Sequence, residues 1–192
     1  MTTDVEERVS FALVCASNQN RSMAAHHLFN NKGLKVKSYG TGSQVKLPGK
    51  SIREANIYDF GTKYIDMYND LKAKDEKFYI QNGLLSMLER NLAIKEAPER
   101  WQKRADHHDV VFTFEDRVFD AVVDDLANST AQYDKPVHVI NMTVKDNHEE
   151  ADKNAKLCIE FCTQIDQCPD WESEISEIVK KFEVKGGKRL LH

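Results

Sequence analysis

The hydrophobic positions of this 192-residue chain form short apolar runs separated by longer amphipathic stretches. The short runs predict four buried strands, at 9–14, 35–39, 109–114 and 137–142. Apolar residues at helical spacing predict helices at 22–32, 116–126, 149–167 and 171–183, and two or more helices between 56 and 91. Because strands and helices alternate, we expect right-handed βαβ units, and therefore an α/β three-layer sandwich with a mainly parallel central sheet flanked by helices.

Two further segments are less regular. Gly40 and Gly42 follow the second predicted strand and indicate irregular backbone at the carboxyl edge of the sheet. Residues 45–49 fit either a small hairpin arm or an ordinary surface loop, and their spacing does not separate these alternatives. Residues 188–192 are typical of the start of an edge strand.

The composition is that of one globular domain spanning residues 1–192, with 41% hydrophobic and 30% charged residues. The formal net charge of -4 argues against a general nucleic-acid binder, which needs an excess of Lys and Arg. No apolar run approaches the roughly 20 residues of a membrane span, and the acidic N-terminal residues differ from a signal peptide. We therefore expect a cytosolic or nuclear protein that binds neither membranes nor nucleic acid directly.

The segment between the first strand and the following helix carries the candidate chemistry. Cys15 ends the strand, and Arg21 begins the helix after five residues without a bulky side chain. The backbone amides of such a loop and the positive end of the helix dipole form an anion site. Arg21 offers a planar pair of donors to two phosphate oxygens, which a lysine does not reproduce. The sequence predicts that a phosphate group is held by residues Ala16, Ser17, Asn18, Gln19, Asn20, Arg21 and Ser22.

Cys15 is then expected to lie under the phosphorus atom, where the same amides and guanidinium favour the nucleophilic thiolate. Ser22 is placed to add a hydroxyl hydrogen bond to the sulfur. The alternative is a small buried hydrophobic residue, which is the commoner role of a cysteine at a strand end. The strand before the loop, the helix after it and the open loop itself favour the nucleophile.

The other cysteines, Cys158, Cys162 and Cys168, lack the spacing of zinc ligands, so we expect neither a metal nor a cofactor. Cys158 and Cys162 share one helix face and are expected to be buried against the sheet. Asn20 stands where a resolving thiol would be needed in the loop, which excludes reversible oxidation there.

A thiolate that attacks phosphorus requires protonation of the departing oxygen, so the mechanism needs a carboxylic acid opposite Cys15. Asp146 is the predicted acid, because it follows the last predicted strand on a short loop at the same sheet edge. Asp116 also follows a strand, but a helix begins there at once. The alternative role for Asp146 is an N-cap of the following helix. In the predicted cycle Asp146 first protonates the leaving group and then activates water to hydrolyse a phosphocysteine, without a metal.

The Cys-x5-Arg-Ser loop and the late aspartate resemble those of the low-molecular-weight protein tyrosine phosphatases. Five longer motifs, at 15–23, 39–42, 45–49, 81–83 and 146–151, resemble more specifically a family of RNA polymerase II C-terminal-domain phosphatases. That family belongs to the cleavage and polyadenylation machinery, and the resemblance covers essentially the whole chain. It implies the low-molecular-weight phosphatase fold with a small hairpin arm.

The resemblance further implies a phosphoserine phosphatase that acts on the fifth residue of the polymerase heptad, before a cis proline. Because cis X-Pro bonds are a minor and slowly formed species, a prolyl isomerase is expected to supply the substrate. The family also implies a symplekin-type scaffold partner and a nuclear role in transcription termination and mRNA 3′-end processing. By matching motif, Cys15, Arg21 and Asp146 are the catalytic residues, and the peptide is flanked by Lys46, Leu47, Pro48, Tyr79 and Met87.

Two other classes of function stay open at this point. The same scaffold supports phosphotyrosine phosphatases and arsenate reductases, although arsenate reduction normally needs resolving thiols beside the loop. The chain could instead be mainly a structural component of the cleavage and polyadenylation complex, in which its activity is dispensable.

Overall fold

The computed structural model describes residues 8–129, 135–186 and 190. At its centre lies a four-stranded sheet in the order β2-β1-β5-β6, in which every neighbouring pair is parallel. The strands are β1 (Phe11–Cys15), β2 (Val36–Gly40), β5 (Val110–Thr113) and β6 (His138–Asn141). All four predicted buried strands are therefore confirmed.

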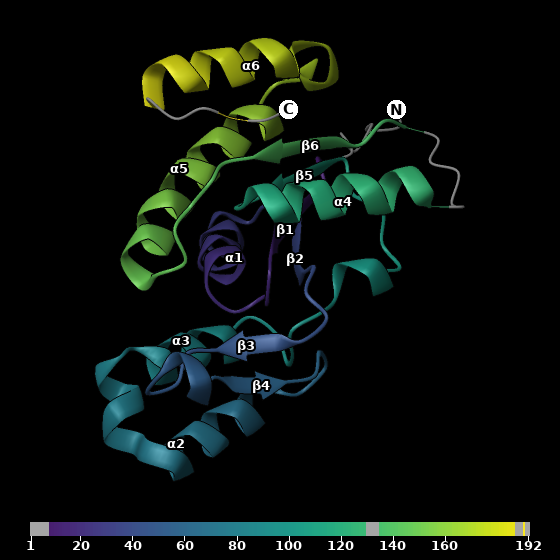
Figure 1. The fold of residues 1–192 in the computed structure, drawn as a ribbon. Helices are drawn as coiled ribbons and strands as arrows, with labels where there is room; N and C mark the ends of the chain where they lie inside the picture. The colour runs from purple at the N-terminus through teal and green to yellow at the C-terminus, as the bar shows by residue number, and fades with distance from the viewer. Residues whose placement is uncertain (1–7, 130–134, 187–189, 191–192) are drawn as a thin grey trace, which may run out of the picture.

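Four helices cover the two faces of this sheet (Figure 1). They are α1 (Arg21–Lys32), α4 (Asp116–Asn128), α5 (His148–Asp166) and α6 (Trp171–Gly186). Phe11 and Leu13 pack with α1, α5 and α6, whereas Ala12 and Val14 pack with α4 on the opposite face. Cys15 continues the spacing of Phe11 and Leu13 and belongs to the same core as α1. The predicted three-layer α/β sandwich is confirmed.

Residues 45–92 form a second packing unit at one end of the sandwich (Figure 1), which we call the 45–92 unit. Its elements are β3 (Val45–Leu47), the 3-10 turn η1 (Ile52–Glu54), β4 (Asn56–Tyr58), α2 (Tyr64–Gln81) and α3 (Leu84–Leu92). A second 3-10 turn, η2 (Trp101–Lys103), follows this unit. The buried residues Met67, Leu71 and Leu88 belong to a second hydrophobic core, which Met23 of α1 joins. Since β3 and β4 pair as an antiparallel sheet, residues 45–49 begin the arm and are not an ordinary loop.

The largest differences from the predictions lie in the region from residue 56 and at the C-terminal helix. The helical region predicted from residue 56 is wrong at its start, because residues 56–58 pair with β3 as a strand, a tertiary contact that local spacing does not contain. Asp75 has non-helical backbone angles and divides α2, and its carboxylate accepts a hydrogen bond from Phe78 N at 3.0 Å. The last helix reaches Gly186. The predicted edge strand lies outside the described residues except for Leu190, which is buried.

Cys158 and Cys162 lie in α5 and are completely buried in the core between α5 and the sheet, as predicted. Burial raises the pKa of the Cys158 thiol well above its ordinary value. These two cysteines therefore act as small core residues.

Acid is expected to destabilise the fold through two buried histidines. His26 Nδ1 lies 2.7 Å from Ser38 Oγ, and His108 Nε2 lies 2.9 Å from Tyr39 Oη. Burial lowers the pKa of each imidazole to about 4. The unfolded chain, with a His pKa of about 6.5, binds more protons between these values, so the free energy of unfolding falls as the pH drops from about 6.5 toward 4. The loss is at most roughly 3 kcal/mol for each ring.

Urea unfolding at pH 7 and pH 5 tests this expectation. His26→Gln is expected to reduce the difference in unfolding free energy between the two pH values, because the amide does not titrate. His27→Gln is the matched control, since the neighbouring His27 is only half-buried and faces Asn31. An unchanged pH dependence in His26→Gln would contradict the role of that ring.

Candidate active site

The loop after Cys15 is tied to the segment that follows β2. Thr41 N donates to the Cys15 carbonyl oxygen at 3.0 Å, and Gly42 N donates to the Ala16 carbonyl oxygen at 2.9 Å. A Cβ at Gly40 would lie 2.7 Å from that same Ala16 oxygen, so the close approach requires glycine. The predicted irregular backbone beside the loop is therefore present.

Asn18 determines the shape of the loop. Its backbone is left-handed (φ 54°), a conformation that asparagine adopts more readily than most residues. Its buried side chain donates to Ser22 Oγ at 3.0 Å and to Ser38 Oγ at 3.1 Å, and accepts from Glu99 N at 3.0 Å. The amide side chain thus fixes the loop to α1, β2 and the segment before η2, which leaves only the backbone of Asn18 for a phosphate.

Cys15 lies at the end of β1, where its Sγ is 3.0 Å from Ser22 Oγ. This is the predicted contact between the sulfur and the hydroxyl. Asn20 precedes α1 but its side chain does not cap the helix. The first amides of α1 consequently lack a side-chain partner and suit an anion above the sulfur.

Arg21 is buried and held from two loops at the carboxyl edge of the sheet. Its Nη1 donates to the Val144 carbonyl oxygen at 2.9 Å, and its Nη2 donates to Glu115 Oε2 at 2.8 Å. Its Nε has no hydrogen-bond partner among the described residues and lies 3.6 Å from Asp146 Oδ1. Burial lowers the pKa of Arg21, but the charges of Cys15, Asp146 and Glu115 outweigh burial and raise it. Arg21 is therefore a fixed cation whose Nε–H is still available to a phosphate.

Side chains of α2 and α3 hold three consecutive carbonyl groups of the loop. Tyr64 Oη donates to the Asn18 oxygen at 2.7 Å, and Asn91 Nδ2 donates to the Gln19 oxygen at 2.9 Å. Arg90 Nη2 donates to the Gln19 oxygen at 3.0 Å and to the Asn20 oxygen at 3.4 Å. The 45–92 unit thus supports the loop from outside, which the sequence did not predict.

Two further, partly buried cations act on the sulfur. Lys95 Nζ donates to the Ser38 carbonyl oxygen at 2.7 Å and to Glu99 Oε2 at 2.8 Å. Burial lowers the pKa of both Lys95 and Arg90, and the charge of Cys15 raises it against that effect. Arg21, Arg90 and Lys95 thus surround the sulfur with three positive charges, each of which also faces a carboxylate.

Asp146 lines the cavity next to the end of the loop, with 60% of its side chain exposed. Its Oδ1 accepts a hydrogen bond from Asn20 Nδ2 at 2.9 Å. The N-cap of α5 is Asn147, whose side chain accepts from Glu150 N at 2.8 Å, so the alternative role of Asp146 as an N-cap is wrong. Asp116 instead accepts hydrogen bonds from Asn141, the last residue of β6, and from Thr143, and does not line the cavity.

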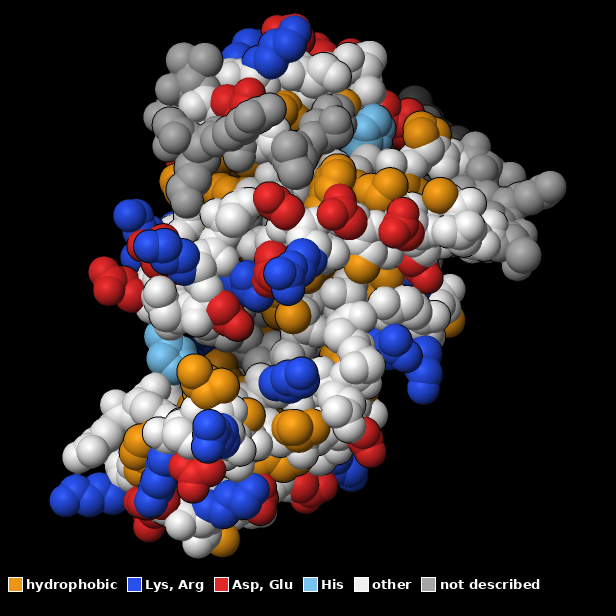
Figure 2. All heavy atoms as spheres, in the orientation of Figure 1, with side chains coloured by type: hydrophobic (Ala, Val, Ile, Leu, Met, Phe, Trp, Pro, Cys, Tyr) orange, Lys and Arg blue, Asp and Glu red, His pale blue; other side chains and the backbone are white. Residues whose placement is uncertain are grey.

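A cavity of about 250 Å³ lies between the loop, the arm, α3 and the segment before α5. Figure 2 shows that the surface is hollowed between the sandwich and the 45–92 unit. Lys46 is fixed beside the loop because its backbone N–H donates to Ser17 Oγ at 3.2 Å. The cavity is lined by Cys15, Ser17, Gln19, Asn20, Lys46, Leu47, Pro48, Asn82, Leu84, Met87, Asp146, Asn147 and His148.

Tyr79, predicted to flank a bound peptide, does not line this cavity. It is only 4% exposed and its Oη accepts a hydrogen bond from Asn56 Nδ2 at 2.9 Å. Asn56 Nδ2 also lies 3.3 Å from the Pro48 carbonyl oxygen, to which it donates. Tyr79 therefore supports the arm through Asn56, and its predicted place beside a bound peptide stays a prediction.

In the part of the chain that the structure describes, no helix is long and apolar enough to span a membrane. Nor do the described residues contain three or more His, Cys, Asp or Glu side chains grouped to hold a metal ion.

A cysteine and an arginine on one anion-binding loop, beside an aspartate that lines the same cavity as the cysteine, provide the groups that a cysteine-dependent phosphatase requires. The chain belongs to the Ssu72-like protein family, whose model matches residues 9–192.

Relatives resemble the chain over most of its length. The RNA polymerase II C-terminal domain phosphatase SSU72 of Bos taurus is 50% identical over 181 residues, which are 94% of this chain and 93% of that protein. The protein of the same name from Homo sapiens is 49% identical with the same coverage. A crystal structure of D. melanogaster Ssu72 with Symplekin, bound to a cis peptidomimetic of the C-terminal domain that carries phosphoserine at position five, is 41% identical with a TM-score of 0.93 and covers 96% of both chains.

Proposed function

We propose that this protein, acting as one phosphatase domain, removes phosphate from phosphoserine in the C-terminal domain of RNA polymerase II through a phosphocysteine intermediate. The observation that carries the proposal is the convergence of Cys15, Asn20, Asp146 and the residues Lys46, Leu47 and Pro48 on one cavity, beside the fixed cation Arg21. The D. melanogaster relative, described as bound to a phosphoserine peptide in the cis form, supports the choice of serine over tyrosine.

In the first step the Cys15 thiolate attacks phosphorus, and the bond between phosphorus and the serine oxygen breaks. The electron pair of that bond goes to the serine oxygen, which takes the proton of the Asp146 carboxyl group. The loop amides and Arg21 Nε neutralise the phosphoryl oxygens.

In the second step a water oxygen attacks the phosphocysteine, and the bond between phosphorus and sulfur breaks. The Asp146 carboxylate takes a proton from this water, so inorganic phosphate leaves and both the thiolate and the protonated acid are restored. Ser22 Oγ, 3.0 Å from the sulfur, donates to the departing thiolate.

The partners of this protein follow the same proposal. A symplekin-type scaffold is proposed because the D. melanogaster relative is described in complex with Symplekin. A prolyl isomerase is proposed to act before this reaction. It supplies the slowly formed cis X-Pro bond of the peptide that the phosphatase then uses as substrate. A nuclear role in transcription termination and 3′-end processing follows from the polymerase substrate.

A panel of phosphorylated heptad peptides tests the substrate. We expect phosphate release from a phosphoserine-proline peptide locked in the cis form, and rates reduced by roughly 100-fold or more with the trans-locked and phosphotyrosine peptides, because misplacement by about 1 Å has this effect. Equal rates for both proline isomers would show that the arm of Lys46, Leu47 and Pro48 does not select proline geometry. Higher rates for phosphotyrosine would favour the tyrosine-directed alternative, and no release from any peptide would favour a structural component of the complex.

A further inference from the structure

A hydrogen bond joins the segment that carries Asp146 to the turn between α2 and α3. Nε2 of His148, the first residue of α5, lies 3.0 Å from the carbonyl oxygen of Asn82. Because a carbonyl oxygen only accepts hydrogen bonds, Nε2 carries the hydrogen and donates. This contact links the sandwich to the 45–92 unit beside the cavity.

The same ring packs against the backbone of the turn. Gly83 has φ +79°, and a Cβ added there would lie 3.1 Å from both Cδ2 and Nε2 of His148. The ring thus occupies the space that a side chain at this position would need. Both the hydrogen bond and the glycine therefore fix His148 on this turn.

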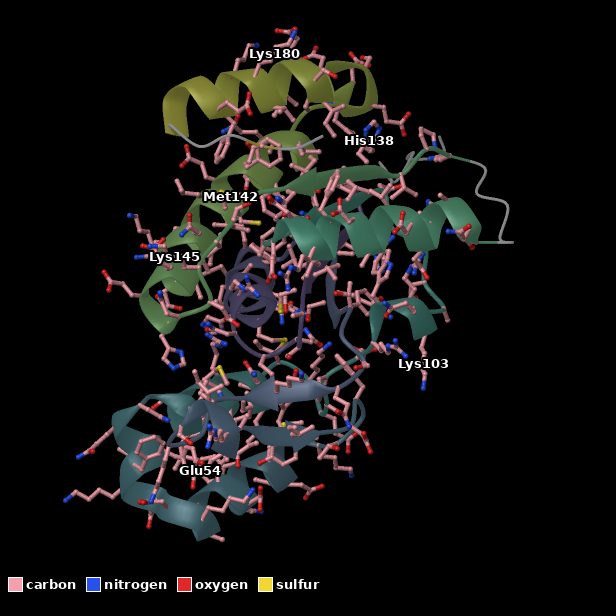
Figure 3. The ribbon with its side chains drawn as sticks, in the orientation of Figure 1. Glu54, Lys103, His138, Met142, Lys145 and Lys180 are labelled. Carbon is pink, nitrogen blue, oxygen red and sulfur yellow. The ribbon has the colours of Figure 1, made fainter. Side chains whose placement is uncertain are left out.

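Each side of the contact carries part of the cavity wall. Asp146 lies two residues before His148, while Leu84 and Met87 belong to α3, directly after the turn. In Figure 3, Met142 lies at the end of β6 and Lys145 lies near the start of α5, the end that faces the 45–92 unit. The segment that carries Asp146 therefore runs from the sheet toward this unit.

The side-chain contacts of the Asp146 carboxylate are with the phosphate-binding loop itself. This carboxylate is largely exposed, it accepts from Asn20 Nδ2, and it faces Arg21 Nε at 3.6 Å. A bound phosphate competes for Arg21, because its oxygens take the same N–H. With phosphate bound, the place of Asp146 depends on the backbone on either side, where Val144 is fixed to the β5 loop and His148 is fixed to the turn.

We propose that His148 is a positioning residue, which holds Asp146 at the cavity that Cys15 also lines by binding the α2–α3 turn. The proposal rests on the assignment of Asp146 as the general acid under the proposed function. It makes the placement of the acid depend on the 45–92 unit, the part of the molecule that also carries the arm.

The test compares two substrates, a phosphoserine-proline peptide and para-nitrophenyl phosphate, whose acidic phenol departs without a proton. His148→Ala is expected to lower kcat on the peptide by roughly 10- to 100-fold, the effect of a misplaced catalytic group, and to change the aryl phosphate rate by less than about 3-fold. His148→Gln is expected to recover most of the loss, since its amide still donates to a carbonyl oxygen. If His148→Ala does not fold, His148→Phe keeps the ring packing and removes the donor.

Asp152→Asn is the matched control. Its carboxylate lies 3.9 Å from Arg90 Nη1, so Asp152 also links α5 to α3, but it lies one turn further along the helix than the acid segment. The rates of Asp152→Asn on the peptide and on para-nitrophenyl phosphate are expected to stay unchanged. The double variant Asp146→Asn/His148→Ala is expected to be no slower on the peptide than Asp146→Asn, because His148 acts through that carboxyl group.

The outcomes separate the two proposals. Equal losses on both substrates in His148→Ala, or additive losses in the double variant, would show that His148 is only structural and overturn the positioning role. An Asp146→Asn variant that slows both substrates equally would overturn the acid assignment of the proposed function, and the positioning role with it. If Asp146→Asn slows only the peptide reaction and His148→Ala slows neither reaction, the positioning role alone would be overturned.

Discussion

Replacement of Cys15 by serine is expected to lower phosphate release from every substrate by roughly 10⁴-fold or more while the protein stays folded. The charge of the sulfur acts on Arg21 and also on the partly buried cations Arg90 and Lys95. A thiolate is the nucleophile that the proposed mechanism needs, whereas a serine hydroxyl in the same place stays protonated near neutral pH. The smaller oxygen fits the space of the sulfur, so the loop and the sheet are expected to keep their structure.

The measurement is phosphate release from the phosphoserine peptide and from para-nitrophenyl phosphate, with thermal unfolding as the check on folding. Cys168→Ser is the matched control, because Cys168 is half-buried next to α6 and lies outside the loop. It is expected to retain wild-type rates, and chelators are expected to leave the wild type unaffected. More than trace activity in Cys15→Ser would remove Cys15 from the nucleophilic role, and inhibition by chelators would indicate a metal enzyme.

The sequence predicted those parts of the fold and site that depend on local pattern. The strand before Cys15 and the helix from Arg21 are close in sequence. The loop between them could therefore be predicted without knowing any distant contact. The rule that loops after parallel strands share one edge then placed Asp146 at the same edge as Cys15. The same rule points to Glu115, which lies two residues after β5 and binds Arg21, but on that connection we considered only Asp116 from the sequence.

The parts that the sequence missed depend on contacts between distant segments. Tyr64 and Arg90 hold loop carbonyls more than 40 residues away, and nothing in their local spacing distinguishes them from surface or core residues. Strand β4 exists because it pairs with β3, and Tyr79 is buried because Asn56 and the arm cover it. His148 was included in a recognised motif, yet its partner Asn82 lies 66 residues earlier.

These distant contacts connect the part of the molecule that carries the proposed catalytic residues to the part that carries the arm. The sandwich supplies Cys15, Arg21 and Asp146, and the 45–92 unit supplies the arm and the groups that support the loop. A change within the 45–92 unit is therefore expected to affect catalysis as well as peptide selection.

Replacement of Asp146 by asparagine is expected to separate substrates by their leaving groups. A serine alkoxide is strongly basic and must be protonated as its bond to phosphorus breaks, whereas an acidic phenol departs as the phenolate. We therefore expect Asp146→Asn to lower kcat on the phosphoserine peptide by roughly 10²- to 10⁴-fold, and that on para-nitrophenyl phosphate by about 10-fold or less. The asparagine side chain keeps an oxygen that accepts from Asn20 Nδ2, so the segment before α5 is expected to hold its place.

The comparison within one variant controls for folding, because both substrates meet the same protein and the same Cys15 loop. The pH dependence of kcat on the peptide gives a second measurement, since the limb that reports the general acid is expected to disappear in Asp146→Asn. Glu149→Gln, at the neighbouring exposed carboxylate of α5, is the matched control and is expected to change neither rate. If both rates of Asp146→Asn fell by a similar factor and the limb persisted, Asp146 would serve only to place the segment between β6 and α5, and another group would supply the proton.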